Sequence, residues 1–104
     1  MELLMTVAII YRWRLKPGKQ EQFRKAWRRR TVELRDEAGA LGSALHKTDD
    51  DVWLAYARWP NLEERERAWN ERPANSTAAD MMQDATAEDF PPIIADVIDD
   101  LLLG

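Results

Sequence analysis

The stretch Val52-Trp53-Leu54-Ala55-Tyr56-Ala57-Arg58-Trp59-Pro60 decides how this 104-residue chain folds. Aromatic and aliphatic side chains dominate it, which favours a β-strand, and Pro60 ends it because proline lacks the backbone N–H that a sheet needs. Successive side chains of a strand point to opposite faces. One face therefore carries Trp53, Ala55, Ala57 and Trp59, and the other carries Val52, Leu54, Tyr56 and Arg58. Both faces are apolar almost to the end, so the sequence predicts a strand that is covered on both sides.

The residues before this strand predict a strand, a helix and a second short strand. Residues 6–15 alternate in the same way, with Val7, Ile9, Tyr11 and Trp13 on one face, and end at the turn signal Lys16-Pro17-Gly18. Residues 19–38 show helical periodicity, with Gly18 as the expected N-cap and Gly39 as the expected stop. Residues 43–48 form a short strand, followed by a turn at Asp49-Asp50-Asp51. The apolar stripe of the helix consists of Phe23, Ala26, Trp27, Thr31, Leu34 and Ala38.

The residues after the quoted strand predict two helices and a last strand. Asn61, followed three residues later by Glu64, is a capping signal for a helix over residues 62–72, which Pro73 closes. Ser76 or Thr77 caps a third, short helix, which Phe90-Pro91-Pro92 breaks. Residues 93–103 are predicted as the last strand, although their apolar residues also fit the period of a short helix. The inner face of the third helix carries Ala78, Met81, Met82 and Ala85.

Composition predicts one domain over residues 1–104 and excludes several classes of function. A formal net charge of -4 argues against binding to nucleic acid or to an acidic membrane surface. The chain has no cysteine, which excludes disulfides and thiolate metal sites and favours the cytoplasm. The apolar run of residues 3–10 is too short to span a bilayer and lacks the basic start and cleavage site of a signal peptide.

The element order β-α-β-β-α-α-β predicts an α+β, ferredoxin-like fold: a four-stranded antiparallel sheet with helices on one face. The other face would show Ala8, Ile10, Leu54 and Tyr56, a patch of the size that usually marks an interface. We therefore expect a homodimer in which two such sheets pack together as a dimeric α+β barrel. Arg12 and Arg58 would lie near the seam, with partners drawn from Asp96, Asp99 and Asp100.

Five tryptophans in a chain of this length suggest an aromatic-lined pocket between the sheet and the helices. Small residues such as Ala55 would leave room beside the rings, but the rings could equally fill the core. His46, the only histidine, is either a general base or a half-exposed strand residue. The basic first helix either steers an anionic substrate or is simply a solvated face. One histidine without cysteine gives no support for a transition-metal site.

The quoted strand, together with Val7-Ala8-Ile9-Ile10-Tyr11-Arg12-Trp13 and Lys16-Pro17-Gly18-Lys19, resembles the antibiotic biosynthesis monooxygenase family. The resemblance covers residues 6–87 and implies the dimeric α+β barrel. It also implies either oxygenases that need no cofactor and use molecular oxygen on phenols and quinones, or haem-degrading enzymes. Oxygenation of this kind needs a dry aromatic pocket, a proton acceptor and hydrogen bonds to an anion.

Carried over residue by residue, the resemblance is partial. Trp59 matches the family's pocket tryptophan, whereas Ala55 stands where the phenol oxygenases carry a functional asparagine. The third helix has no histidine for haem iron, so haem is disfavoured. The hypothesis is a monooxygenase acting on a small aromatic molecule, with a non-catalytic dimeric ligand-binding or stabilising protein as the alternative. The predicted catalytic residues are Tyr11, His46 and Trp59, and the predicted substrate-binding residues are Trp13, Trp27, Trp53, Ala55, Trp69 and Met82.

Overall fold

The computed structural model describes residues 6–71 and 77–102. Within these ranges the chain forms four strands and three helices, in the order predicted from the sequence. The elements are β1 (Val7–Leu15), α1 (Gln20–Glu37), β2 (Gly42–Lys47), β3 (Trp53–Trp59), α2 (Leu62–Glu71), α3 (Thr77–Ala85) and β4 (Thr86–Asp96). The predicted ends of the second helix at Arg72 and Pro73, and its neighbour's cap at Ser76, lie outside the described residues.

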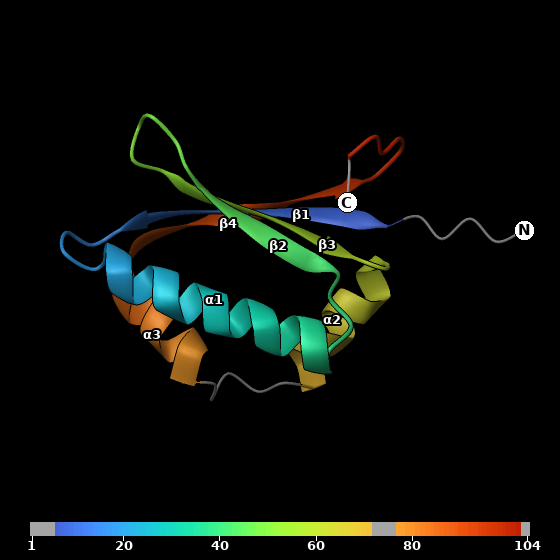
Figure 1. Cartoon of the computed structure of the whole chain (residues 1–104), viewed down its shortest axis with the longest axis horizontal. Helices are drawn as coiled ribbons and strands as arrows, with labels where there is room; N and C mark the ends of the chain where they lie inside the picture. The colour runs from blue at the N-terminus through green and yellow to red at the C-terminus, as the bar shows by residue number, and fades with distance from the viewer. Residues whose placement is uncertain (1–5, 72–76, 103–104) are drawn as a thin grey trace, which may run out of the picture.

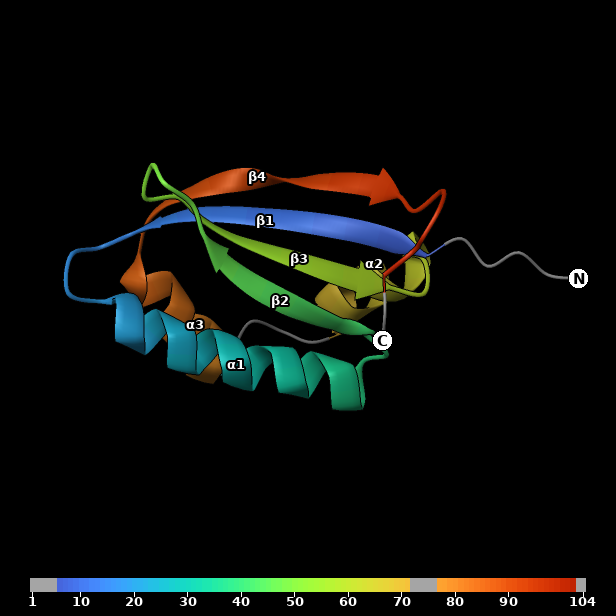
Figure 2. The same ribbon diagram turned by 45° about the horizontal axis from the view of Figure 1, so that its top comes forward.

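The strands form one antiparallel sheet in the order β2-β3-β1-β4, and all three helices lie on one side of it (Figure 1). Figure 2 shows β1 and β3 as the two central strands. This is the predicted ferredoxin-like α+β fold, with an open sheet rather than a barrel closed within one chain.

The helix-facing sides of β1 and β3 supply most of the core, as their alternation predicts. Val7, Ile9, Trp13, Ala55 and Trp59 are all buried. Their register explains why they share one face, because Val7 lies opposite Trp59 and Tyr11 lies opposite Ala55. The largest fully buried side chains are Trp59, Phe23 and Ile9. Burial of such aromatic and branched groups is the main favourable contribution to folding.

The helix ends follow the sequence in part. Asn61 caps α2 as predicted: its Oδ1 accepts a hydrogen bond from the Glu64 amide at 2.8 Å. Gly39, at φ 87°, follows the end of α1 in the left-handed region that favours glycine. The prediction of Gly18 as N-cap is wrong, because Lys19 takes that position without a side-chain capping bond. Gly18 instead supplies the positive φ of the turn before the helix.

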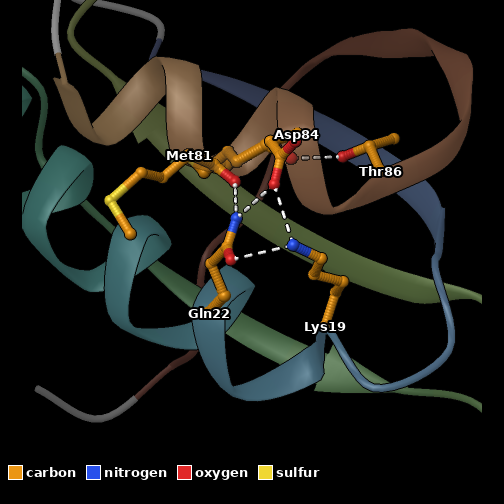
Figure 3. Close-up of polar contacts among 6 residues, drawn as sticks. Lys19, Gln22, Met81, Asp84 and Thr86 are labelled. Atoms are coloured by element: carbon orange, nitrogen blue, oxygen red, sulfur yellow. Dashed lines mark hydrogen bonds and ion pairs between the residues drawn. The ribbon is translucent and has the colours of Figure 1, made fainter.

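A cluster of polar side chains fastens α3 to the start of α1 (Figure 3). Gln22 Nε2 donates to Met81 O at 3.0 Å and to Asp84 Oδ2 at 2.9 Å. Lys19 Nζ binds the same Asp84 oxygen at 3.1 Å. At the end of α3, Thr86 Oγ1 donates to Met82 O at 2.7 Å, which supplies a partner for a carbonyl of the last turn. These contacts hold α3 beside α1 and beneath the sheet.

The position of the last strand was predicted wrongly. β4 begins at Thr86, immediately after α3, and ends at Asp96, so Phe90-Pro91-Pro92 lies inside the strand rather than before it. Two features allow this. β4 is an edge strand, where proline is tolerated, and the register shifts so that Pro91 and Pro92 together lie opposite Tyr11 alone. Residues 97–102 are neither strand nor helix.

The sheet face opposite the helices, called the open face below, is covered in part by the chain itself. Residues 97–102 turn back onto this side of the sheet (Figure 1), where Arg58 Nη1 binds Asp100 Oδ2 at 2.9 Å. Ala8 is buried, contrary to expectation, whereas Ile10, Leu54 and Tyr56 are half-buried. Ala8 is therefore not part of the exposed apolar surface of this face.

Of the two arginines predicted to pair with C-terminal aspartates, only one does so within the chain. Arg58 pairs with Asp100, as described above. Arg12 instead donates from Nη2 to Pro91 O at 3.3 Å and lies 5.5 Å from the centroid of the Phe90 ring. Asp96 is the last residue of β4, where it lies opposite Val7.

Candidate functional site

The core between sheet and helices consists of two clusters, and Tyr11 contacts both. The first contains Val7, Ile9, Trp59 and Ala68, and the second contains Trp13, Phe23, Ala55 and Ala85. Tyr11 lies between them because it sits at the middle of β1, with its side chain on the helix face. A tyrosine in this place brings a hydroxyl group into an otherwise apolar junction.

Two residues of α2 lie against the Tyr11 ring. The Trp69 ring is nearly parallel to it, with centroids 6.4 Å apart and planes 6° apart. The Arg65 guanidinium carbon lies 4.6 Å from the Trp69 centroid and 5.8 Å from the Tyr11 centroid. Arg65 Nε also donates to Tyr11 Oη at 3.4 Å. The three groups thus form a small triangle, which we call the Tyr11 site.

Two tryptophans beside Tyr11 differ in their exposure to solvent. Trp59 is 1% exposed and meets Trp69 edge to face, with centroids 6.1 Å apart. Trp69 itself is 43% exposed. An exposed indole beside a buried one offers an aromatic surface that a flat apolar ligand can reach from solvent.

The hydroxyl of Tyr11 is held in its neutral form. Burial raises its pKa above the ordinary value of 10.0, and the hydrogen bond and charge of Arg65, followed by the charge of Arg30, lower it in part. The group is therefore a hydrogen-bond donor at neutral pH and not a base. Among the described residues, no group of three histidine, cysteine, aspartate or glutamate side chains is placed to hold a metal ion.

Comparison with known proteins places this chain in a family. The model of the antibiotic biosynthesis monooxygenase family matches residues 6–81, which is most of the chain. The chain belongs to the antibiotic biosynthesis monooxygenase family. Among curated proteins, none matches the sequence. Within the described part of the chain, no helix combines the length and apolar character needed to cross a bilayer.

Solved structures agree with this family in fold. SnoaB, a cofactor-independent oxygenase from Streptomyces nogalater, matches with a TM-score of 0.76 at 14% identity, covering 93% of this chain and 97% of that one. Rv0793 from Mycobacterium tuberculosis matches with a TM-score of 0.73 at 14% identity, covering 93% and 99%. A protein from Nitrosomonas europaea with the same family designation matches with a TM-score of 0.70 at 22% identity, covering 94% of each chain.

In this member of the monooxygenase family, the predicted site residues divide between the two clusters. Trp59 lies in the first cluster and contacts Trp69, and Tyr11 joins the two clusters. The remaining predicted binding residues pack in or against the second cluster. These residues are Trp13, Trp27, Trp53, Ala55 and Met82.

His46 is placed far from this arrangement in the fold. It is exposed on the edge strand β2 and lies opposite Leu54, which shares the open face with Arg12. Tyr11 lies on the other face of the sheet. The chain therefore does not bring its one histidine to the Tyr11 site, and the proton acceptor predicted there has no support from the geometry.

Arg65 is the site residue that the sequence analysis missed. The signal was present: Leu62, Arg65 and Trp69 are spaced by three and four residues, which puts them on one side of α2. The Asn61 cap fixes where the helix begins, and Leu62 and Ala68 pack against the core. A basic residue between two inward positions must lie at the boundary of the core, and Arg65 does.

Proposed function

We propose that the protein is a monooxygenase that uses molecular oxygen, without a cofactor, on a small phenol-like aromatic substrate bound at the Tyr11 site. The observation that carries the proposal is the half-buried Tyr11 hydroxyl, set among aromatic rings that reach the surface at Trp69. Family membership and the fold shared with SnoaB, described as a cofactor-independent oxygenase, support it.

The reaction needs no external reductant. Conversion of an electron-rich phenol to a quinone adds one oxygen atom of O2 to the ring and releases the other as water, and the substrate supplies all four electrons. The protein has to bind the ring in a dry place and stabilise the substrate anion that reacts with oxygen. Trp69 offers the stacking surface, and neutral Tyr11 offers a hydrogen bond to the substrate oxygen.

Since Tyr11 is neutral and His46 lies on the other face, the substrate would ionise in solution, before it binds in the dry site. This favours acidic phenols and hydroquinones over simple ones. The rate should then rise with pH across the ionisation range of each substrate, and substrates of different acidity should give different pH profiles.

Oxygen uptake on a panel of anthrols, naphthols and hydroquinones tests the proposal. Tyr11→Phe should lower kcat/KM by about tenfold or more, because it deletes a hydrogen bond to an anion. Tyr56→Phe is the matched control: it removes the chain's other tyrosine hydroxyl, which lies on the open face. No turnover of any panel member under air would refute the oxygenase function.

The second candidate is a non-catalytic protein that binds a small aromatic ligand. It is favoured by one observation, that the Tyr11 site contains a neutral phenol and a guanidinium but no general base. This alternative predicts quenching of tryptophan fluorescence by the same compounds without oxygen consumption. The two readouts on one set of samples separate the candidates.

We further propose that two copies pair through their open faces. Ile10, Leu54 and Tyr56 are half-buried there, and the folded-back segment adds Leu101, which is 94% exposed. Arg58 lies beside these groups, so Arg58→Leu should change the dimer dissociation constant measured by analytical ultracentrifugation. A wild-type protein that sediments as a monomer at micromolar concentration would refute the pairing.

A further inference from the structure

Arg65 is a half-buried cation whose contacts are with rings and a neutral hydroxyl. Its guanidinium lies over Trp69 and Tyr11, and its Nε donates to Tyr11 Oη. No described aspartate or glutamate forms an ion pair with it, whereas its neighbour Arg67 binds Glu64 at 2.9 Å. Partial burial of an arginine without a carboxylate partner is costly, and a bound anion would offset that cost.

The Tyr11 hydroxyl also lacks one of its hydrogen-bond partners. It accepts the bond from Arg65, so its own hydrogen remains available, and the described part of the chain provides no acceptor for it. A hydroxyl donor and a guanidinium donor therefore lie side by side. Together they match one oxygen that accepts two hydrogen bonds.

Two positive charges act on this hydroxyl. Arg30, which projects from α1, adds its charge to that of Arg65, and both lower the pKa of Tyr11. Arg30 does contact Glu33, but only at 3.7 Å. In a chain of net charge -4, these two arginines favour a negatively charged group beside the Tyr11 hydroxyl.

From this juxtaposition of Arg65, Tyr11 and Trp69, we infer that the site selects aromatic ligands that carry an anionic oxygen, a carboxylate or a phenolate, and that Arg65 determines this preference. The inference rests on the proposed binding of an aromatic substrate here, and it narrows the substrate class. The ring stacks on Trp69, while the anionic oxygen accepts hydrogen bonds from Tyr11 Oη and from the guanidinium. Arg65 is in this view a substrate-binding residue.

The test compares two probes of equal shape, 2-naphthoate and its neutral amide 2-naphthamide, by isothermal titration calorimetry at pH 7. The wild-type protein should bind 2-naphthoate about tenfold or more tightly than the amide, as a charge-assisted hydrogen bond predicts. Arg65→Met should remove this preference, and Arg65→Lys should retain part of it. Arg67→Met is the matched control, since it deletes the same charge from an exposed position of α2 and should leave the preference intact.

A third probe, 2-naphthol titrated across its ionisation, distinguishes phenolate from carboxylate recognition. Equal binding of 2-naphthoate and 2-naphthamide by the wild type, or no binding of either at millimolar concentration, overturns the inference. An unchanged preference in Arg65→Met overturns it as well. A preference for the anion without oxygen uptake on any phenol would support this inference while refuting the oxygenase, so the two failures are distinguishable.

Discussion

Replacement of Trp59 by alanine should destabilise the protein far more than the same replacement of Trp69. Trp59 is 1% exposed and packs in the first core cluster, whereas Trp69 is 43% exposed. A buried tryptophan removes roughly 200 Å² from water, worth about 5 kcal/mol at ~25 cal/mol per Å². Measured costs for such truncations are about 3–5 kcal/mol. Trp69 buries about half as much, so we expect about half that cost, about 1.5–2.5 kcal/mol.

Urea unfolding followed by far-ultraviolet circular dichroism measures both variants without relying on tryptophan fluorescence. With a slope of about 1.5 kcal/mol per molar urea, Trp59→Ala should move the midpoint down by about 2–3 M and Trp69→Ala by about 1–1.7 M. All samples are compared at one protein concentration, because pairing of copies would make the midpoint concentration-dependent.

The contrast between the two variants decides which tryptophan is available to a ligand. If Trp59→Ala costs no more than Trp69→Ala, the Trp59 ring is not packed as described, and its assignment to the core is wrong. If Trp59→Ala costs about twice as much free energy of unfolding as Trp69→Ala, a loss of activity in Trp59→Ala is explained by loss of the fold. Ligand contact must then be tested at Trp69, whose replacement leaves the fold largely intact.

Three further predictions concern single polar groups. Asn61→Ala should lower the free energy of unfolding by about 1 kcal/mol, and Asn61→Asp should restore it, because an oxygen at this position caps α2. Burial raises the pKa of Tyr11, so the free energy of unfolding should fall as pH rises above the ordinary tyrosine range. Because Arg65 lowers the pKa of Tyr11, Arg65→Met should raise this pKa further, as measured by phenolate absorbance. The pKa of Asp84 is lowered, chiefly by the hydrogen bond from Gln22, so the contribution of Asp84 to stability should be lost as pH falls through the lowered value. The free energy of unfolding of Asp84→Asn, measured against pH in the acid range, should lack this loss.

The central sheet was predictable because the alternation of side chains along its strands determines it. Alternation in β1 and β3 assigned Val7, Ile9 and Trp59 to the helix side, and the register of these strands confirms it. Each side chain on these two central strands either meets a helix or lies on the open face, so a one-residue slip would exchange the faces completely. The pattern therefore has one consistent solution.

β4 was not predictable by the same means because edge strands obey weaker constraints. Its inner positions carry residues such as Asp89 and Ile94, which are exposed, so no clean alternation marks it. Pro91 and Pro92 normally argue against a strand, and the register shift opposite Tyr11 accommodates them. That accommodation depends on the neighbour across the sheet, which a local pattern does not contain.

The site was predictable in its residue types but not in its chemistry. A count of aromatic residues pointed to Tyr11, Trp59 and Trp69, which the fold does bring together. His46 was predicted as a catalytic residue because histidine is the usual base at neutral pH, yet the strand register places that residue on the open face. Register is a property of two strands, so a single-residue argument could not have excluded it.

The Tyr11 site exists because the core is divided. A phenylalanine at position 11 would join the two clusters without a polar group, and the apolar packing would be equally good. The hydroxyl instead raises the cost of burial and is compensated by one long hydrogen bond of 3.4 Å from Arg65. Arg65 in turn lies against rings, and no carboxylate of the described residues forms an ion pair with it. Each group leaves the other incompletely satisfied, and a ligand oxygen placed between them would relieve both, which is why the polar pair is better explained by binding than by stability.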